Sequence, residues 1–331
     1  MGGAQTAGGD ELMTVVLSRR NLISFGAAAA TLSATSSARA AKAGFFRRTR
    51  LLIGLQLYTL GPGLAADLDN QLSQVAKTGY RTVELAGYLG RTPKELRAAF
   101  DKAGVSCTSA HVQGRKGGSD PSLVELDRLI PDAHAIGAST IVLPIFPFPT
   151  HIDMKPRPGD DRGAVLGRMA AQMTLDDWKA TADLLNTAGA GLKKAGLALG
   201  YHNHNVEFAA VGGTTGMDYL LKNTDPALVH FEMDAGWVVA AGADPFALLK
   251  AHPHRFRQMH VKDIKATTKP NFAFRQDPTE VGSGIIDWKK LLPASYAAGV
   301  RGYFVEQEAP FEKPRIEAVK VSFDYLNRLV A

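Results

Sequence analysis

Short apolar runs alternate with amphipathic helical patterns along the chain from residue 51 onward. The apolar runs predict strands, and the segments with apolar residues at helical spacing predict helices. The predicted strands cover residues 51–60, 82–86, 107–112, 140–146, 197–204, 229–237, 256–264 and 303–308. The predicted helices cover residues 68–78, 92–102, 123–135, 175–194, 216–222, 245–251, 288–298 and 315–329. Thr92 is a typical N-cap, because Pro93 follows it and Glu95 lies in the first turn.

Regular alternation of strands and helices is typical of a parallel sheet. Eight such units in a chain of 331 residues predict a single (β/α)8 TIM barrel, since this fold takes about 250 residues or more. No Gly-x-Gly-x-x-Gly pattern follows the first strand, which disfavours a dinucleotide-binding sheet. Two connections, 147–174 and 265–287, are long and leave the C-terminal ends of strands, so we expect them to serve as lids or as an interface between copies of the chain.

The first forty residues differ in pattern from the rest of the chain. Arg19 and Arg20 precede a mild apolar run, and Ala38-Arg39-Ala40 is typical of a signal cleavage site. This pattern predicts a twin-arginine signal peptide over residues 1–40 and a TIM-barrel domain over residues 41–331. We therefore expect a periplasmic or secreted protein with no stable membrane insertion after cleavage. Met13 would give a more compact n-region, so the start codon is Met1 or Met13.

Composition narrows the function classes. With 45% hydrophobic and 21% charged residues, the chain is neither disordered nor fibrous. Cys107 is its single cysteine, which excludes an internal disulfide and a Cys-rich zinc site. The formal charge of +6 is not gathered into a basic stripe with interleaved aromatics. We therefore expect a small-molecule substrate and no nucleic-acid partner.

Imidazole and carboxylate groups lie near the C-terminal ends of six predicted strands, where a barrel core would carry Val, Ile and Leu. These ends meet at one mouth of a barrel, and such side chains are metal ligands. The polar residues at these ends are Glu84, His111, His202, Asn203, His204, Glu207, Asp234, His260, Lys262, Asp263, Glu306 and Glu308. Their conjunction predicts a site for one divalent metal ion.

Several segments resemble the sugar phosphate isomerase/epimerase family of xylose isomerase-like TIM barrels. The resemblance covers roughly residues 50–330 and rests on the segments Leu199–His204, Phe231–Trp237, Met259–Asp263, Val281–Trp288 and Val305–Glu308. It implies one Mn²⁺, Co²⁺, Mg²⁺ or Zn²⁺ ion held by residues from strands five to eight. By position it implies Asp234, His260 and Glu306 as ligands. The family's fifth-strand Glu is replaced here by His202, which is the expected fourth ligand, with Glu207 as its rival.

In that family a metal-bound substrate carbonyl acidifies the neighbouring C–H, and two metal-bound glutamates act as paired bases. Only Glu306 of that pair is matched here, so His204 or Glu207 would supply a second catalytic group. We expect an isomerase or epimerase of a sugar or polyol. The alternatives are a lyase or hydrolase that cleaves 3-keto-glycosides by β-elimination, and a non-catalytic exported sugar-binding protein.

Five further residues at the predicted mouth are candidates for substrate binding. Each also has a structural alternative: a rim salt bridge for Glu84, packing under a loop for Trp237, and a pair with Asp263 for Lys262. We read Asp287 and Trp288 as structural, with Asp287 the N-cap of a helix. The candidate substrate-binding residues are Glu84, His111, Trp237, Lys262 and Glu308.

Overall fold

A computed structural model describes residue 1 and residues 43–331 with the exception of residue 154. The predicted signal segment over residues 1–40 lies outside these described residues, apart from Met1. Residues Gly44–Ala331 form one compact unit. No helix in the described part of the chain is long and apolar enough to cross a membrane.

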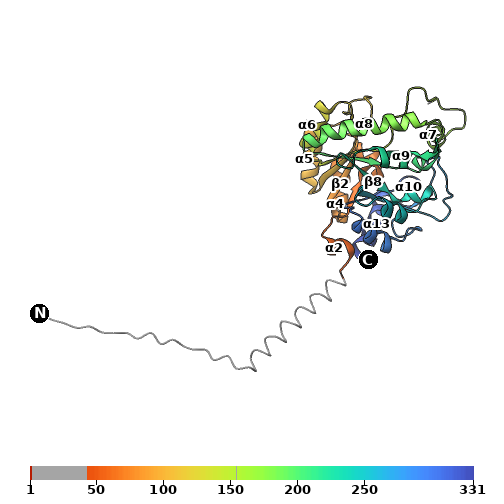
Figure 1. Ribbon diagram of the computed structural model, residues 1–331. Helices are drawn as coiled ribbons and strands as arrows, with labels where there is room; N and C mark the ends of the chain where they lie inside the picture. Colours follow the sequence, from red (N-terminus) through yellow and green to blue (C-terminus); the bar gives the residue numbers. More distant parts are fainter. Residues whose placement is uncertain (2–42, 154) are drawn as a thin grey trace. The chain divides into compact units, whose positions relative to one another are not determined.

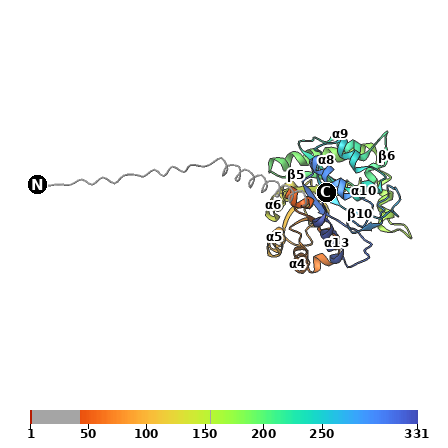
Figure 2. The same ribbon diagram turned by 90° about the horizontal axis from the view of Figure 1, so that it is seen from below.

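Eight parallel strands close into a barrel in the order β1-β12-β9-β8-β5-β4-β3-β2, which confirms the predicted (β/α)8 fold. Figures 1 and 2 show the helices arranged around these strands. The barrel strands are β1 (Gly54–Gln56), β2 (Thr82–Ala86), β3 (Ser106–His111), β4 (Thr140–Leu143), β5 (Ala198–His202), β8 (Val229–Asp234), β9 (Phe256–Val261) and β12 (Gly302–Val305). Short two-residue strands pair outside the barrel: β6 (Ala210–Val211) with β7 (Thr214–Thr215), and β10 (Asp263–Ile264) with β11 (Pro278–Thr279).

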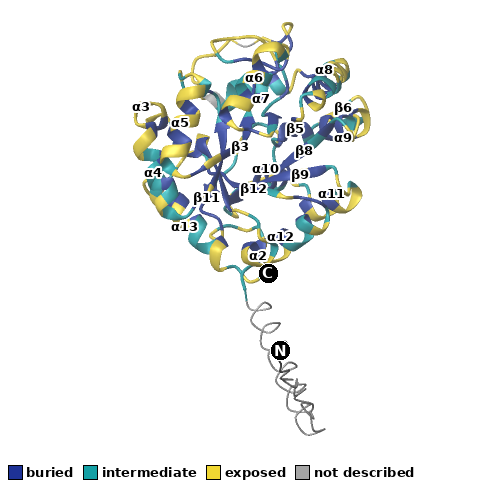
Figure 3. Ribbon diagram, turned by 90° about the vertical axis from the view of Figure 1, so that its left-hand side faces the viewer, coloured by how far each residue is buried: buried dark blue, intermediate teal, exposed yellow. Residues whose placement is uncertain are grey.

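One principal helix follows each barrel strand along the chain. These helices are α4 (Leu68–Thr78), α5 (Pro93–Ala103), α6 (Leu126–Ile136), α8 (Leu175–Lys194), α9 (Gly216–Asn223), α11 (Pro245–Ala251), α12 (Trp288–Ala297) and α13 (Arg315–Arg328). The smaller helices are α2 (Phe45–Thr49), α3 (Gly63–Ala66), α7 (Arg162–Ala170) and α10 (Ala235–Ala240), with 3₁₀ turns at η1 (Leu57–Leu60) and η2 (Val206–Phe208). Thr92 caps α5 as predicted and forms a capping box with Glu95, and Asp287 caps α12 as predicted. In Figure 3 the strands are buried, and the exposed residues lie on the outer sides of the helices.

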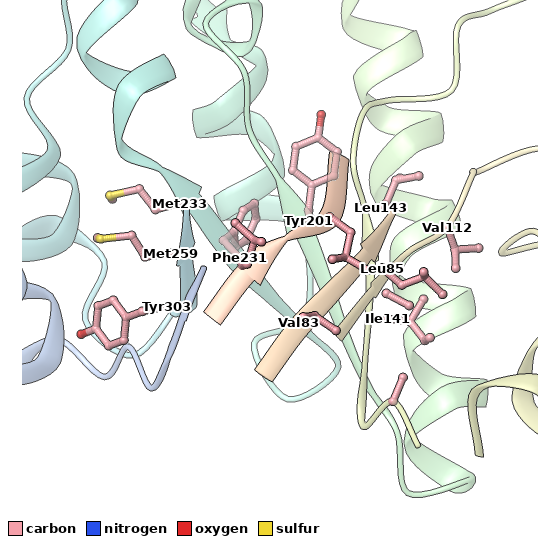
Figure 4. Packing of buried hydrophobic residues seen from close by; sticks show 14 of the residues in the cluster. Val83, Leu85, Val112, Ile141, Leu143, Tyr201, Phe231, Met233, Met259 and Tyr303 are labelled. Atoms are coloured by element: carbon pink, nitrogen blue, oxygen red, sulfur yellow. The ribbon is translucent and has the colours of Figure 1, made fainter. Parts of the chain in front are cut away.

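The hydrophobic core lies between the strands and the helices. Residues on alternate strand positions, such as Val83, Leu85, Phe231 and Met233, are buried there (Figure 4). Because successive side chains of a strand point to opposite faces, the positions between them point into the barrel. On β2 and β8 those positions are Glu84, Glu232 and Asp234, all fully buried.

Six of the barrel strands are shorter than predicted, and for two of them the reason involves the site. The predicted strand 51–60 ends at Gln56, because the Gln56 side chain accepts a hydrogen bond from Tyr58 N and caps η1. The predicted strand 229–237 ends at Asp234, because Asp234 accepts a hydrogen bond from Trp237 N and caps α10. The sequence pattern predicts neither α10 nor α7, and α7 lies within the long connection 147–174.

Candidate metal centre and its carboxylate–imidazole network

Four of the predicted ligands meet at the C-terminal ends of β5, β8, β9 and β12. His202, Asp234, His260 and Glu306 each place a nitrogen or oxygen atom within 4.8 Å of the others, and all four are buried. His260 Nδ1 lies 2.9 Å from Glu306 Oε2 and 3.7 Å from Asp234 Oδ2. His202 Nε2 lies 3.9 Å from Asp234 Oδ2. We call these four residues the outer cluster.

A second group lies beside the outer cluster and uses the other nitrogens of the same two histidines. His111, His202, Glu232 and His260 also bring ligand atoms within 4.8 Å of one another. Glu232 Oε2 is 3.2 Å from His111 Nε2, 3.2 Å from His202 Nδ1 and 3.1 Å from His260 Nε2. Glu84 Oε1 is 3.0 Å from His111 Nε2 and 2.6 Å from His260 Nε2. We call Glu84, His111 and Glu232 the inner cluster.

Lys262 places its ammonium group among three carboxylates. Its Nζ is 2.8 Å from Asp234 Oδ2, 2.8 Å from Glu306 Oε2 and 2.7 Å from Glu308 Oε1. Burial alone would lower the pKa of Lys262, but the three carboxylates outweigh burial and raise that pKa well above its usual value. Lys262 is therefore an ammonium ion at neutral pH, and the alternative pairing with Asp263 is wrong.

Asp263 instead holds a loop. Its Oδ2 accepts hydrogen bonds from Gly282 N and Trp288 Nε1, each at 2.9 Å, and from Gly284 N at 3.2 Å. Its Oδ1 accepts from Ile286 N at 3.2 Å and from Ile264 N at 3.0 Å. The buried carboxylate thus anchors the segment 282–288, which supports the structural reading of Trp288.

Protonation preferences differ sharply among the histidines. Burial lowers the pKa of His202 well below its usual value, so its ring is neutral. Burial would also lower the pKa of His111, but Glu84 and Glu232 raise it to about 9.

The carboxyl group of Glu306 is also shifted. Burial would raise its pKa, but the neighbouring Lys262 and His260 outweigh burial and hold that pKa well below its usual range. Glu306 is therefore a carboxylate at neutral pH.

The outer cluster fits a divalent cation. Two imidazoles and two carboxylates form a donor set that Zn²⁺, Mn²⁺ or Co²⁺ accepts. Asp234 Oδ1 accepts a hydrogen bond from Trp237 N, whereas Asp234 Oδ2 is buried, accepts no hydrogen bond from a neutral donor among the described residues, and lies 2.8 Å from the Lys262 ammonium. A buried carboxylate oxygen without a hydrogen bond is costly unless a cation faces it. Lys262 supplies one positive charge there, and a metal ion would supply more.

His204 and Glu207 lie outside both clusters. Glu207 Oε1 accepts a hydrogen bond from Tyr201 Oη at 2.8 Å, and its Oε2 accepts one from His204 N at 2.9 Å. Burial raises the pKa of Glu207 to about 7. Because both oxygens are held by protein donors, Glu207 is poorly placed as the rival fourth ligand. Burial also lowers the pKa of His204 to about 3, so its ring is neutral.

Three predicted substrate contacts lie deeper than expected. Glu84 is fully buried and belongs to the inner cluster, so it forms neither a rim salt bridge nor an exposed sugar contact. His111 shares that cluster, with 12% of its side chain exposed. Trp237 is 1% exposed and packs against His204, Phe274 and the Lys262 ammonium. Its ring therefore has no free face for a sugar in this conformation. Glu308, with 29% of its side chain exposed, keeps access to solvent.

The two long connections meet beside the site. Arg275 pairs with Asp161 at 3.1 Å, which joins the connection after β9 to the start of α7. Asn205 Nδ2 donates to Asn271 O and Oδ1, each at 2.9 Å. Phe274 then packs on His204 and Trp237. These contacts hold the two connections beside His204 and Trp237.

Four further residues of the site lie one layer below the strand ends and are absent from the sequence-based prediction. Glu232 lies two positions before Asp234, and Gln258 lies two positions before His260. Gln56 and Ser109 complete the same layer by contacting Glu84. Strand periodicity of two places such residues on the same inward face. That periodicity was the signal that could have found them.

Comparisons with known proteins agree with this architecture. Residues 72–329 match the model of the xylose isomerase-like TIM barrel family. The chain belongs to this family. An inosose dehydratase from Geobacillus kaustophilus is 24% identical over 278 residues, which cover 79% of this chain and 87% of that relative. An inosose dehydratase from Geobacillus thermodenitrificans is 31% identical over 160 residues, 44% of this chain and 53% of that relative.

A solved structure extends the similarity. A sugar phosphate isomerase/epimerase from Parabacteroides distasonis superposes with a TM-score of 0.65 at 29% identity. The superposition covers 84% of this chain and 94% of that protein. The resemblance stated from sequence is thereby confirmed at the level of the family, and the chain is a member of a family of enzymes.

Proposed function

We propose that this protein is a divalent-metal-dependent lyase that removes a proton next to a ketone and expels an oxygen substituent from the β position. The substrate class is a keto-cyclitol or a 3-keto-glycoside, and the leaving group is water or an alcohol. This reading gives the β-elimination alternative precedence over isomerisation and epimerisation.

The arrangement of bases carries the proposal. Epimerisation by two bases needs a free base on each face of the substrate. The strand-five position is held by His202, whose Nδ1 lies 3.2 Å from Glu232 and whose Nε2 faces Asp234 in the outer cluster. On the other side, the Glu306 carboxylate lies 2.8 Å from the Lys262 ammonium. A carboxylate beside a cationic acid is the pair that β-elimination requires. The dehydratase relatives described above support the same choice.

The proposed reaction keeps every atom and electron in balance. When bound, the metal ion would polarise the ketone and lower the pKa of the adjacent C–H. Glu306 accepts the proton from that carbon, and the electron pair of the broken C–H bond forms the C=C bond. The β C–O bond breaks, and the Lys262 ammonium donates a proton to the departing oxygen. The products are an enone and water or an alcohol, with no net oxidation.

The role of Glu306 has a direct test with a matched control. Glu306→Gln removes the base, and general-base catalysis contributes about 10²–10⁴-fold to rate, so we expect a loss of that size. Glu312→Gln alters an exposed carboxylate in the same C-terminal part of the chain, paired with Lys265, and should leave turnover within twofold. The measurement is formation of the ultraviolet-absorbing enone from a 3-keto-glucoside or a keto-inositol. Wild-type rates for Glu306→Gln with metal bound would refute the assignment.

Isomerase or epimerase activity is the second candidate, because the Parabacteroides distasonis structure bears that name at 29% identity. It predicts a new stereoisomer or aldose–ketose exchange without enone.

We also propose that the protein acts outside the cytoplasm, after removal of residues 1–40, on a small molecule rather than on nucleic acid. Deleting residues 1–40 should keep the enzyme in the cytoplasm, as cell fractionation would show.

A further inference from the structure

We propose that Glu84 and Glu232 are positioning residues that determine which ring nitrogen of His260 and of His202 faces the outer cluster. Each histidine turns one nitrogen to an inner carboxylate and the other to the outer cluster. Carboxylates that hold the distal N–H of a ligating histidine fix its tautomer and ring orientation. The inference rests on metal binding by the outer cluster, as in the proposed function, but not on the reaction catalysed.

The orientation of Glu84 is set by a chain of hydrogen bonds that begins at the backbone. Tyr58 N donates to Gln56 Oε1 at 2.9 Å, which leaves the Gln56 amide nitrogen facing Glu84. Gln56 Nε2 then donates to Glu84 Oε1 at 2.8 Å. Since a backbone N–H can only donate, the direction of this chain is fixed. It delivers a donor to Glu84 and so requires Glu84 to accept.

A second chain reaches the other oxygen of Glu84 from below. His230 Nε2 and Gln258 Oε1 are 3.0 Å apart, and Gln258 Nε2 donates to Ser109 Oγ at 2.9 Å. The Ser109 hydroxyl in turn donates to Glu84 Oε2. Both oxygens of Glu84 therefore accept from fixed donors.

The consequence for His260 follows from the acceptor character of Glu84. His260 Nε2 lies 2.6 Å from Glu84 Oε1, so this nitrogen carries the proton that Glu84 accepts. The opposite nitrogen, Nδ1, faces Glu306 and Asp234 in the outer cluster. The Gln56–Glu84 chain thus presents Nδ1 of His260 as the ligand atom.

Glu232 acts on His202 in the same way. His202 and Glu232 are paired in register between β5 and β8, and His202 Nδ1 lies 3.2 Å from Glu232 Oε2. His202 Nε2 is thereby left for the outer cluster. Glu232 and Asp234 lie on one face of β8, so a single strand supplies both the carboxylate that orients the histidine and a carboxylate of the outer cluster.

The rival arrangement is a metal ion in the inner cluster, because His111, His202, Glu232 and His260 also converge there. That ion would need Nε2 of His260, which Glu84 already holds at 2.6 Å. Ions in both clusters at once would require two bridging imidazolates. The geometry therefore favours a metal in the outer cluster, with the inner carboxylates orienting its ligands.

Metal affinity of variants tests the inference without any substrate. Dissociation constants for Co²⁺ would be measured by chelator competition, together with the visible spectrum of bound Co²⁺, on the wild type and on Glu84→Leu and Glu232→Leu. Loss of such partners weakens metal binding about 10–100-fold, so we expect that loss and an altered spectrum in both variants. Glu84→Gln and Glu232→Gln retain an acceptor oxygen and should recover part of the affinity.

The control and a milder variant keep the test decisive. Glu280→Leu removes another buried carboxylate, paired with Lys313 at 3.2 Å outside both clusters, and should bind Co²⁺ within twofold of wild type. If Glu84→Leu does not fold, Gln56→Leu acts one hydrogen bond further from the metal and should weaken binding severalfold, with an altered spectrum.

Three outcomes would overturn the inference. The first is wild-type affinity and spectrum in Glu84→Leu (or in Gln56→Leu) and Glu232→Leu. The second is wild-type affinity in Glu306→Gln together with complete loss in Glu232→Leu, which would place the ion in the inner cluster. The third is absence of metal binding by the wild type, which would also refute the proposed function. The first outcome leaves the proposed function intact.

Discussion

Replacing Lys262 by Met removes the cation that lies among Asp234, Glu306 and Glu308. All three nitrogen–oxygen distances are 2.7–2.8 Å, and the lysine is fully buried. Removing one partner of a buried ion pair leaves an uncompensated charge and costs about 3–5 kcal/mol. For a barrel of this size, roughly 2 °C of Tm per kcal/mol converts that cost into a fall of about 6–10 °C in metal-free buffer.

Metal should offset much of this loss, because a divalent ion neutralises the Asp234 and Glu306 carboxylates. We therefore expect Mn²⁺ or Zn²⁺ to raise the Tm of Lys262→Met by more than it raises that of the wild type. The assay is thermal unfolding with EDTA and with saturating metal. Lys265→Met is the matched control, because Lys265 forms partly exposed ion pairs with Asp277 and Glu312, and such pairs contribute about 0–1 kcal/mol. Equal stability of the two variants in EDTA would show that Lys262 is not the counter-charge that the three buried carboxylates require.

Two further predictions concern buried carboxyls. Asp263→Ala removes the carboxylate that anchors the loop 282–288. Since each unsatisfied buried donor costs about 1–3 kcal/mol, we expect the free energy of unfolding in urea to fall by at least about 3 kcal/mol. A fall of less than about 1 kcal/mol would contradict this role of Asp263. Glu207 has a folded pKa of about 7 against an ordinary value of 4.5. The folded state therefore retains a proton that the unfolded state releases, and this contribution to stability falls as pH rises from 4.5 through 7. Relative to Glu207→Gln, the wild type should lose about 3 kcal/mol between pH 4 and pH 8, and parallel pH profiles of the two proteins would refute the assignment.

The barrel could be predicted from the sequence because its signals are local. Apolar runs of strand length, helix caps such as Thr92, and glycines after helices each mark one element. Helix α10 was missed because it begins directly at Asp234, with no loop residues to separate it from β8. Strand β1 was overextended because the cap that ends it is made by a side chain, Gln56, that reads as part of the strand.

The four residues of the outer cluster could be predicted from the sequence, whereas the residues that support them could be predicted only in part. Reading the strand ends identified His202, Asp234, His260 and Glu306, which the structure brings together. The partner of Lys262 was missed because proximity in sequence favoured Asp263, whereas the fold brings three carboxylates from two other parts of the chain. Side chains at successive inward positions of different strands meet only once the register of the barrel is known. The sequence does single out Glu84 and His111, as substrate contacts, but Glu232 and the meeting of these three residues in the inner cluster depended on the structure.

The most direct test of the central claim is proton NMR in D₂O with the metal-loaded mature protein, a 3-keto-glucoside and a keto-inositol. We expect enone signals and release of alcohol or water, both abolished by EDTA and by Glu306→Gln. Deuterium incorporation with a new stereoisomer and no enone would contradict the lyase proposal and establish an isomerase or epimerase. Metal-independent binding without any chemical change would contradict catalysis itself.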